Sequence, residues 1–320
     1  MTSLAATRAQ ARSGMRPVDS KRDLVGLADL IELAFAEGMD PSGRRMAQEM
    51  RRFGRLGWLG WLIGRLVLPP AAYPNGYVWI EGGRLVGNAS LMPVESDRER
   101  WVMANVAVHP AYRRRGIARR LVGACIDLAR RRLVREIVLQ VRPETPGAAN
   151  LYRSFGFVDA GTRVTWRLAD SPRLAAAPGL PARRRRPEDG EAQWHLARRV
   201  SPLGLLWPHP LRRSIFRTEA WYAADAWTHW VWPERGPIRA CLMVRPELGG
   251  GRQMILLTEP EAAGSAEAPL LERALTERAG VRNVSLESFA GDGEAAVRAA
   301  GFREEHRLIW MSLNLRGGRR

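Results

Sequence analysis

The sequence predicts an α/β (α+β) chain of two domains with similar folds. Apolar, β-branched segments alternate with amphipathic helical segments along most of the 320 residues, as in mixed sheets covered by helices. A stretch rich in Pro, Ala, Gly and Arg at 169–185 is typical of a linker. We therefore expect one domain at 1–168 and a second at 186–315, in line with the two domains that this length favours.

Paired landmarks in the two halves indicate an internal duplication. Arg16-Pro17 near the start of the first half recurs as Arg186-Pro187 near the start of the second. Gly156-Phe157 recurs as Gly301-Phe302, and each pair precedes a strand-like run that ends near a tryptophan. The same order in both halves predicts two copies of one fold.

The first half shows a regular succession of elements. Its apolar spacing, glycine turns and β-branched runs predict, in order, a strand and helix within Met15–Glu37, a helical segment from Ser42 to Leu68, a hairpin from Gly76 to Met92 that turns at Glu81–Arg84, a strand from Trp101 to Val108, a helix from Ile117, a strand from Ile137 to Val141 and a helix from Thr145. In the last helix, Thr145 is a candidate N-cap and Pro146 the first helical residue.

The most informative segment is the basic turn Arg113–Arg119, between a strand and a helix. Gly116 lets the backbone approach a ligand closely, and Ala118 keeps the next turn of the helix small. Successive N–H groups at the positive end of a helix dipole form a site for a pyrophosphate. On its own, a run of arginines is more often a solvated loop.

Two motifs together distinguish the basic turn from an ordinary solvated loop. The order Arg-x-x-Gly-x-Ala after a strand, followed one helix and one strand later by Ala148, Leu151-Tyr152 and Gly156-Phe157, resembles the acyl-CoA signature of the GNAT N-acetyltransferase superfamily. The family commonly has Asn where this chain has Thr145. The tandem arrangement is similar in architecture to that of mycothiol synthases, without transfer of their substrate.

The resemblance implies a fold, a cosubstrate and a set of site residues. Each domain is expected to be a mixed, mostly antiparallel sheet with a splayed central strand pair flanked by helices. Acetyl-CoA is the implied cosubstrate, without a metal. The implied cofactor-binding residues are Val106, Ala107 and Val108 along the strand, Arg113, Arg114, Arg115, Gly116, Ile117, Ala118 and Arg119 in the basic turn, and Thr145 and Ala148 at the later helix.

The implied reaction is direct attack of a primary amine on the thioester carbonyl. Tyr152 occupies the family position of the acid that protonates the departing thiolate, although a half-buried helix tyrosine is the simpler interpretation of that residue alone. The base is open: Glu95, Glu99 and His109 lie nearby in sequence, and His109 reads better as a turn residue. The acceptor is a small molecule or a peptide N-terminus.

Charge and cysteine content limit the partners. The net charge is +17, and residues 1–168 carry 27 basic and 15 acidic residues against 23 and 18 in the remainder. A positive surface attracts the phosphates of acetyl-CoA. Nucleic acid would also fit the charge, but no recognised nucleic-acid motif accompanies it. The distant Cys125 and Cys241 and a polar N-terminus predict a cytoplasmic protein without disulfides.

The apolar run Phe53–Leu68 is the part of the first half whose role the sequence predicts least well. It contains Arg55 and Arg65 and ends at Pro69-Pro70, so it is too short and too charged to span a bilayer. Packing against the rest of the protein, a hydrophobic acceptor surface and an interfacial helix remain open. The oligomeric state is equally open, with a homodimer as one form.

The second half departs from the family pattern where chemistry is expected. After the apolar strand Met254–Leu257 come Glu259 and Glu261, two carboxylates where a pyrophosphate needs donors. Val297 stands at the position that corresponds to Tyr152. The second half is therefore predicted to be a degenerate copy of the first, which keeps the fold and lacks the cofactor site. Two other functions remain: a non-catalytic CoA-binding or regulatory module, and a basic nucleic-acid-associated protein.

Overall fold

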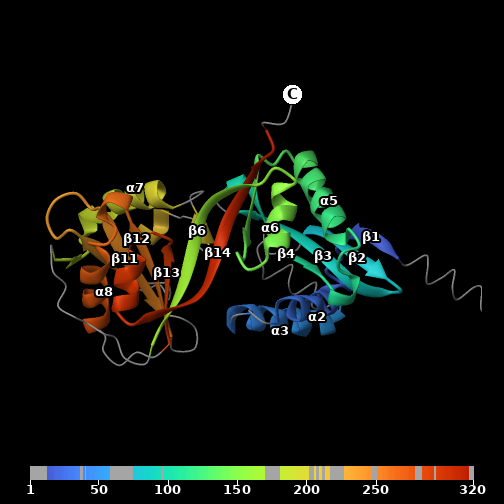
Figure 1. Ribbon diagram of the computed structural model, residues 1–320, viewed down its shortest axis with the longest axis horizontal. Coiled ribbons are helices and arrows are strands. Elements are labelled where there is room, and N and C mark those ends of the chain that lie inside the picture. The colour runs from blue at the N-terminus through green and yellow to red at the C-terminus, as the bar shows by residue number, and fades with distance from the viewer. Residues whose placement is uncertain are drawn as a thin grey trace, which may run out of the picture. The chain divides into compact units, whose positions relative to one another are not determined.

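The computed structural model describes residues 13–36, 39, 41–57, 75–94, 97–169, 181–201, 205–206, 209–210, 213–216, 227–246, 251–277, 283–291 and 293–316. Its contacts divide the chain into two compact units (Figure 1). The first unit comprises Met1–Leu139, Asn150–Val158 and Ser312–Arg320, and the second comprises Gln140–Ala149 and Asp159–Met311. Most of the expected linker at 169–185 lies outside the described residues.

The first-half elements confirm the predicted succession. In chain order they are β1 (Gly14–Pro17), α2 (Leu24–Phe35), α3 (Pro41–Arg55), β2 (Asn75–Glu81), β3 (Arg84–Val94), β4 (Asp97–Val108), α5 (Ile117–Arg131), β5 (Glu136–Val141), α6 (Pro146–Arg153) and β6 (Val158–Leu168). The hairpin turns at Gly82 and Gly83, whose φ angles of 55° and 80° suit a tight turn between antiparallel strands. Of the run Phe53–Leu68, residues 58–68 lie outside the described part of the chain.

The first unit is a sheet in the order β1-β2-β3-β4-β5, with helices on both faces. Figure 1 shows α2 and α3 on one side of strands β2–β4 and α5 on the other. Six consecutive buried residues in β3, Val86 to Leu91, reflect this double coverage. Gly87 allows α5 to approach, because a Cβ there would lie 2.9 Å from Cγ2 of Ile117. The close packing fixes where α5 begins and therefore where the basic turn lies.

The central strands of the first unit splay apart, as the family resemblance implied. β4 and β5 pair in parallel only where Arg100–Val102 faces Glu136–Val138. From Met103 onward, β4 has no ladder partner on its β5 side within the described residues. An edge of unpaired N–H and C=O groups is therefore available to a ligand that carries amides.

The second unit contains a comparable sheet and core. Its remaining elements are β7 (Arg183–Arg184), α7 (Gly190–Val200), β8 (Leu205–Leu206), β9 (His209–Pro210), β10 (Thr228–Trp232), β11 (Ala240–Pro246), β12 (Arg252–Thr258), α8 (Glu267–Thr276), β13 (Val284–Phe289), α9 (Glu294–Ala299) and β14 (Phe302–Asn314). The strand order is β14-β6-β13-β12-β11-β10-β7. β12 and β13 pair in parallel only from Arg252–Ile255 to Val284–Glu287, so this central pair also opens. Trp230 and Trp232 of β10 are buried in the core of this unit.

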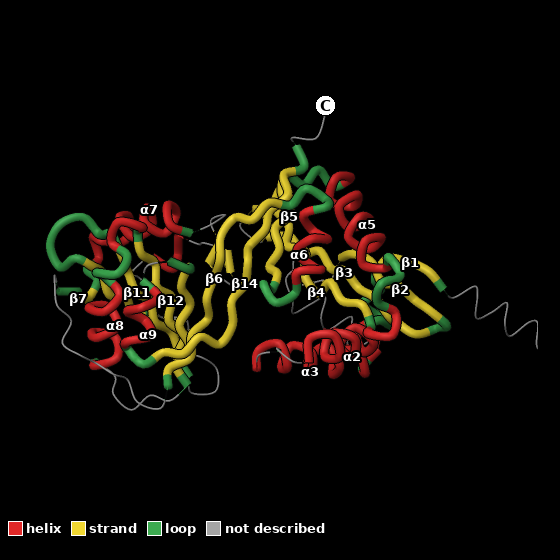
Figure 2. The backbone as a smooth tube through the Cα atoms, in the orientation of Figure 1, coloured by secondary structure: helices red, strands yellow, loops and turns green. Residues whose placement is uncertain are grey.

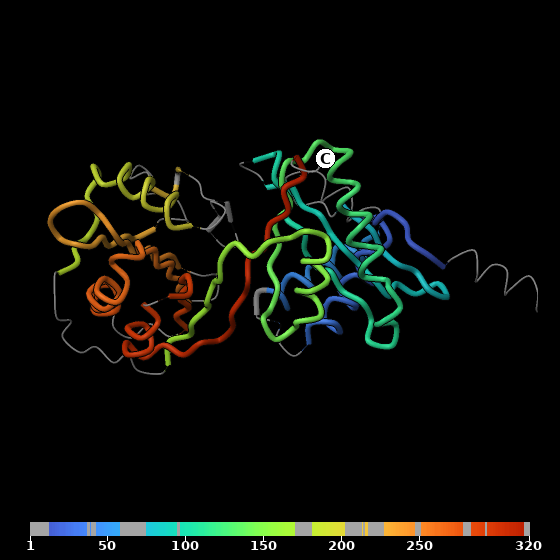
Figure 3. Tube along the Cα trace, turned by 45° about the horizontal axis from the view of Figure 1, so that its top comes forward, coloured from blue at the N-terminus to red at the C-terminus, as the bar shows by residue number. Residues whose placement is uncertain are grey.

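Each compact unit is made of more than one segment of the chain. β6, which ends the first half of the sequence, pairs with β13 through Arg163–Arg167 and Ser285–Phe289. Figure 2 shows β6 and β14 as long neighbouring strands. The end of β14 returns to the first unit, where the N–H of Leu315 donates to the carbonyl of Arg135 at 2.8 Å (Figure 3, red).

The same arginine–aspartate ion pair occurs before the first helix of each unit and indicates that the two units share a fold. In the first unit, Arg16 of β1 forms two 2.6 Å hydrogen bonds to the carboxylate of Asp23, the residue before α2. In the second, Arg183 of β7 holds Asp189, the residue before α7, at 2.6 and 2.9 Å. The structural counterpart of Arg16 is therefore Arg183, and the sequence-based pairing with Arg186 is wrong by three positions.

Candidate active site

The basic turn leaves β4 through a short helical segment. The ring Nδ1 of His109 accepts the N–H of Ala111 at 3.2 Å and starts the 3-10 turn Pro110–Tyr112. Arg114 and Gly116 then adopt left-handed conformations, with φ of 63° and 75°. Alternation of left-handed residues with others turns successive N–H groups toward one side, the geometry of an anion-binding nest.

The N–H groups of this nest are available to a ligand. Among the hydrogen bonds of the described residues, none uses a backbone N–H between Arg114 and Ala118. They lie at the start of α5, a helix of 15 residues whose dipole is positive at this end. Gly116 faces open space, because a Cβ built there would meet nothing within 4 Å. The turn therefore fits a pyrophosphate group.

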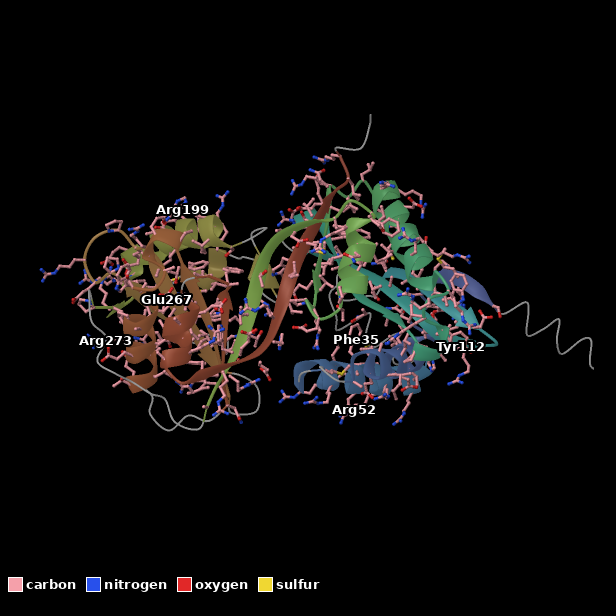
Figure 4. The ribbon with its side chains drawn as sticks, viewed as in Figure 1. Phe35, Arg52, Tyr112, Arg199, Glu267 and Arg273 are labelled. Atoms are coloured by element: carbon pink, nitrogen blue, oxygen red, sulfur yellow. The ribbon has the colours of Figure 1, made fainter. Side chains whose placement is uncertain are left out.

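The arginine side chains surround this nest with positive charge. Arg113 donates from Nε to the carbonyl of Val108 at 3.3 Å, which ties the turn to the strand. Arg115 lies 5.0 Å over the ring of Tyr112, a residue labelled in Figure 4. Arg119 lies 5.5 Å over the ring of Phe155. These contacts hold the side chains in place while the guanidinium groups stay exposed.

A bulge interrupts β4 next to the splayed edge. Asn88 of β3 pairs with Ala107 and Ser90 with Ala104, so Asn105 and Val106 have no ladder partner on β3. Asn105 has a φ of 53°, in the left-handed region that Asn tolerates better than most residues. Bulges of this kind redirect backbone groups beside active sites.

Asn88 fixes this bulge from the neighbouring strand. Its buried side-chain Nδ2 donates to the carbonyl oxygen of Asn105 at 2.7 Å and to the hydroxyl of Ser90 at 3.0 Å. The carbonyl of Asn105 therefore points toward β3. Because C=O and N–H are opposed across a trans peptide, the N–H of Val106 points away from β3. Sequence reasoning missed Asn88, since only the register of β3 against β4 brings it to the bulge.

Tyr152 of α6 lies in the first unit and is 6% exposed. Its ring meets that of Phe157 edge-on at 5.8 Å. Burial raises the pKa of the phenol above its ordinary value, so the hydroxyl stays protonated at neutral pH.

The start of α6 agrees with the expectation. Pro146 is the first helical residue, as predicted. Thr145 stands at the N-cap position, because its carbonyl accepts the N–H of Ala149 at 3.3 Å, and its hydroxyl donates to the carbonyl of Arg142 at 2.9 Å. The N–H of Ala148 donates to the carbonyl of Thr145 at 2.9 Å. Both residues group with the second unit, and their place in the cofactor site stays a prediction.

The candidate bases have other contacts. His109 holds the turn, as described above. Glu99 accepts hydrogen bonds from Arg316 at 2.7 Å and from Arg135 at 3.5 Å, which favours a structural role. Glu95 lies outside the described residues. Among the described residues there is also no group of three or more His, Cys, Asp or Glu that could hold a metal ion.

The second unit lacks the bulge. β11 and β12 pair in continuous register from Ala240–Thr258 to Pro246–Arg252. Glu259 accepts from Arg199 at 2.5 Å and from Arg239 at 3.1 Å, and Glu261 from Arg239 at 3.3 Å. The two carboxylates that the sequence placed against a pyrophosphate are therefore engaged in ion pairs.

No helix within the described residues has the length and apolar character needed to cross a membrane.

Known proteins resemble this chain in part of its sequence and in its fold. A model of the acetyltransferase (GNAT) family matches residues 43–157. N-alpha-acetyltransferase RimI of Mycobacterium tuberculosis is 38% identical over 104 residues, which are 30% of this chain and 64% of RimI. The chain thus covers less than two thirds of that relative's length.

The structural likeness extends over nearly the whole chain. A GCN5-related N-acetyltransferase from Sphaerobacter thermophilus has a TM-score of 0.62 at 19% identity, covering 94% of this chain and 95% of that one. A tandem GNAT protein from the clavulanic acid biosynthesis pathway has a TM-score of 0.53 at 21% identity, covering 94% of this chain and 98% of that one. Residues 43–157 thus match the acetyltransferase (GNAT) family, and the chain as a whole has the fold of a tandem GNAT protein.

Proposed function

We propose that the protein is an acetyl-CoA-dependent N-acyltransferase that moves an acetyl group to a primary amine, with the chemistry in the N-terminal domain, residues 1–168. The observation that carries the proposal is the nest of available N–H groups between Arg114 and Ala118. This nest follows β4, whose edge toward β5 has no ladder partner beyond Val102 among the described residues. A pyrophosphate on the nest and a pantetheine along Val106–Val108 would use both features.

The bulge supplies a donor for the reaction. The N–H of Val106, turned away from β3 by the bond between Asn88 and Asn105, is suited to donate to the thioester oxygen. As the amine attacks, a C–N bond forms and negative charge collects on that oxygen. A donor already oriented toward the developing charge lowers the barrier.

Proton transfers complete the exchange. The C–S bond breaks, the thiolate leaves, and the hydroxyl of Tyr152 protonates it. The ammonium proton passes to water, because none of the candidate bases in the described residues is free for the task. The raised pKa of Tyr152 keeps its proton in place beforehand and makes the phenolate short-lived, so the tyrosine must be reprotonated promptly.

We propose a peptide N-terminus or a small amine as the acceptor. The name of the Mycobacterium tuberculosis relative, N-alpha-acetyltransferase, favours an α-amino group as the first class to test. We assign the second domain, residues 186–315, a supporting role as a degenerate copy. A cytoplasmic location is supported by Cys125 and Cys241, which are buried and form no disulfide.

A second function has one observation in its favour. The low exposure of Tyr152 and its edge-on contact with Phe157 also suit a packed core residue. In that case the first domain would bind CoA as a regulatory module without turnover.

A screen for acetylated products separates the two functions. The protein is incubated with acetyl-CoA and panels of peptides with free N-termini, polyamines and aminoglycosides, and products and free CoA thiol are followed by mass spectrometry and a thiol reagent. The proposal expects an acetylated amine with an equal amount of thiol. CoA binding without either product from any panel would identify the regulatory module.

A further inference from the structure

The outward side of α5 and the neighbouring strand β2 in the first unit carry a concentration of positive charge (Figure 1). Arg120, Arg131 and Arg132 are exposed, and within the described part of the chain they form no ion pair. Asp127, the acidic residue of α5, pairs with Arg130 at 3.4 Å. No described acidic side chain therefore neutralises the other three arginines.

Two of these arginines lie against aromatic side chains of β2. The guanidinium of Arg120 lies 5.4 Å over the ring of Trp79, and Nη2 of Arg131 donates to the hydroxyl oxygen of Tyr77 at 3.2 Å. Tyr77 and Trp79 are two positions apart on the strand and share one face of it. Nε1 of Trp79 donates to Glu81, the acidic residue of β2, at 3.2 Å. We call Tyr77, Trp79, Arg120, Arg131 and Arg132 the α5–β2 surface.

The spacing of the arginines along α5 matches a phosphate chain. Arg120 and Arg131 are 11 positions apart, close to three full turns, so they lie on the same side of the helix and about 16 Å apart along its axis. Successive phosphates of one nucleic-acid strand advance by about 3.4 Å, so this distance corresponds to about five nucleotides. Because the aromatic contacts already orient the two guanidinium groups, little side-chain freedom is lost when they bind.

The apolar content of this region is too low for a membrane anchor. Met15, the ladder partner of Trp79 on β1, is 42% exposed, and Leu133, which follows α5, is 83% exposed. These two residues lie toward opposite ends of α5, whereas a helix on a membrane buries a continuous apolar face. Unpaired arginines beside aromatic rings are instead the combination that binds single-stranded nucleic acid.

We propose that the α5–β2 surface binds single-stranded nucleic acid without sequence preference. The three arginines contact phosphates, and the ring edges of Tyr77 and Trp79 border the path of the strand. This surface does not include the nest at Gly116, so the proposal goes beyond the proposed function and does not depend on it.

Binding of a labelled oligonucleotide tests the proposal. The full chain is titrated into a fluorescein-labelled oligouridylate of about 20 nucleotides between about 50 and 200 mM KCl, with fluorescence anisotropy as the signal. We expect a dissociation constant of about 1–100 μM near physiological salt, and an affinity that falls linearly on logarithmic axes as salt rises. The triple variant Arg120→Gln/Arg131→Gln/Arg132→Gln should bind roughly 10- to 100-fold more weakly, with a salt slope smaller by about 2.

A variant of equal charge in the second unit is the matched control. Arg198, Arg235 and Arg303 are exposed there, and Arg198 lies 5.9 Å over the ring of Trp194, as Arg120 does over Trp79. The triple variant Arg198→Gln/Arg235→Gln/Arg303→Gln should keep its affinity for the oligonucleotide within about twofold. Equal losses in the two triple variants would overturn the proposal, because net charge alone would then account for binding.

Two further measurements separate a surface effect from a folding effect. Lysine at positions 120, 131 and 132 keeps the charge and should keep most of the salt slope, and the melting temperature and CoA affinity of both α5 variants should match those of the unsubstituted protein. A salt slope that falls equally in the lysine and glutamine variants would overturn the proposal. So would absence of oligonucleotide binding by the unsubstituted protein, including the case in which it binds phosphatidylserine vesicles instead.

Discussion

The side chain of Asn88 donates a 2.7 Å hydrogen bond to the backbone carbonyl of Asn105, across two neighbouring strands. Asn105 is left-handed and unpaired in the β-ladder, so this bond holds a conformation that a regular strand would not adopt. The corresponding strands of the second unit run in continuous register. The bulge therefore distinguishes the domain that we propose to be catalytic.

Asn88→Ala should reduce turnover more than binding. Without the side-chain donor, the peptide between Asn105 and Val106 is free to rotate, and the proposed donor to the thioester oxygen is lost for part of the time. We expect kcat to fall roughly 10- to 100-fold with the KM for acetyl-CoA nearly unchanged. Steady-state kinetics with the acceptor found in the screen provides both constants.

Ser90→Ala is the matched control, because it removes the other partner of Asn88 and leaves the bond to Asn105 in place. Similar losses of kcat in both variants, or a rise in KM without a change in kcat after Asn88→Ala, would show that Asn88 only supports the fold.

Tyr152→Phe keeps the ring against Phe157 and removes the proton donor. We expect CoA affinity to stay nearly constant while turnover falls roughly 100-fold. The loss should shrink at low pH, where solvent can protonate the thiolate. Normal turnover would make water the acid, and a joint loss of affinity and thermal stability would identify Tyr152 as a core residue.

Local features of the fold could be predicted from the sequence. The Gly82-Gly83 turn, the strand before the basic turn and the start of α6 at Pro146 depend on short-range preferences, and the structure has them where expected. The splayed strand pair followed from the family resemblance rather than from the residues alone.

Features that depend on distant contacts could not be predicted. The pairing of β6 with β13 joins residues more than 100 positions apart, and Asn88 meets the bulge only through strand register.

His229 should make the second unit sensitive to acid. Burial, with a smaller effect of Arg185, lowers the pKa of this histidine to about 3. The unfolded chain then binds more protons between about pH 6.5 and 3, so stability falls as the pH drops through that window, at most by about 1.4 kcal/mol per pH unit. Denaturant unfolding of the protein and of His229→Gln between pH 7 and 4 measures this slope.

The difference in slope isolates His229 from other titrating groups. His195→Gln, at an exposed position of α7, serves as the control and should keep the slope of the unsubstituted protein. An identical slope in His229→Gln would show that His229 does not contribute to the acid sensitivity.

Calorimetric titration with CoA tests the central claim, that this chain binds the cosubstrate once, on the nest at Gly116. We expect a stoichiometry near one and a loss of at least about thirtyfold in affinity for Gly116→Glu, equivalent to about 2 kcal/mol, because the new carboxylate meets the pyrophosphate. Gly82→Glu places the same side chain at another left-handed glycine facing open space, and should bind as the unsubstituted protein does. A stoichiometry near two, or full affinity in Gly116→Glu, would contradict the account.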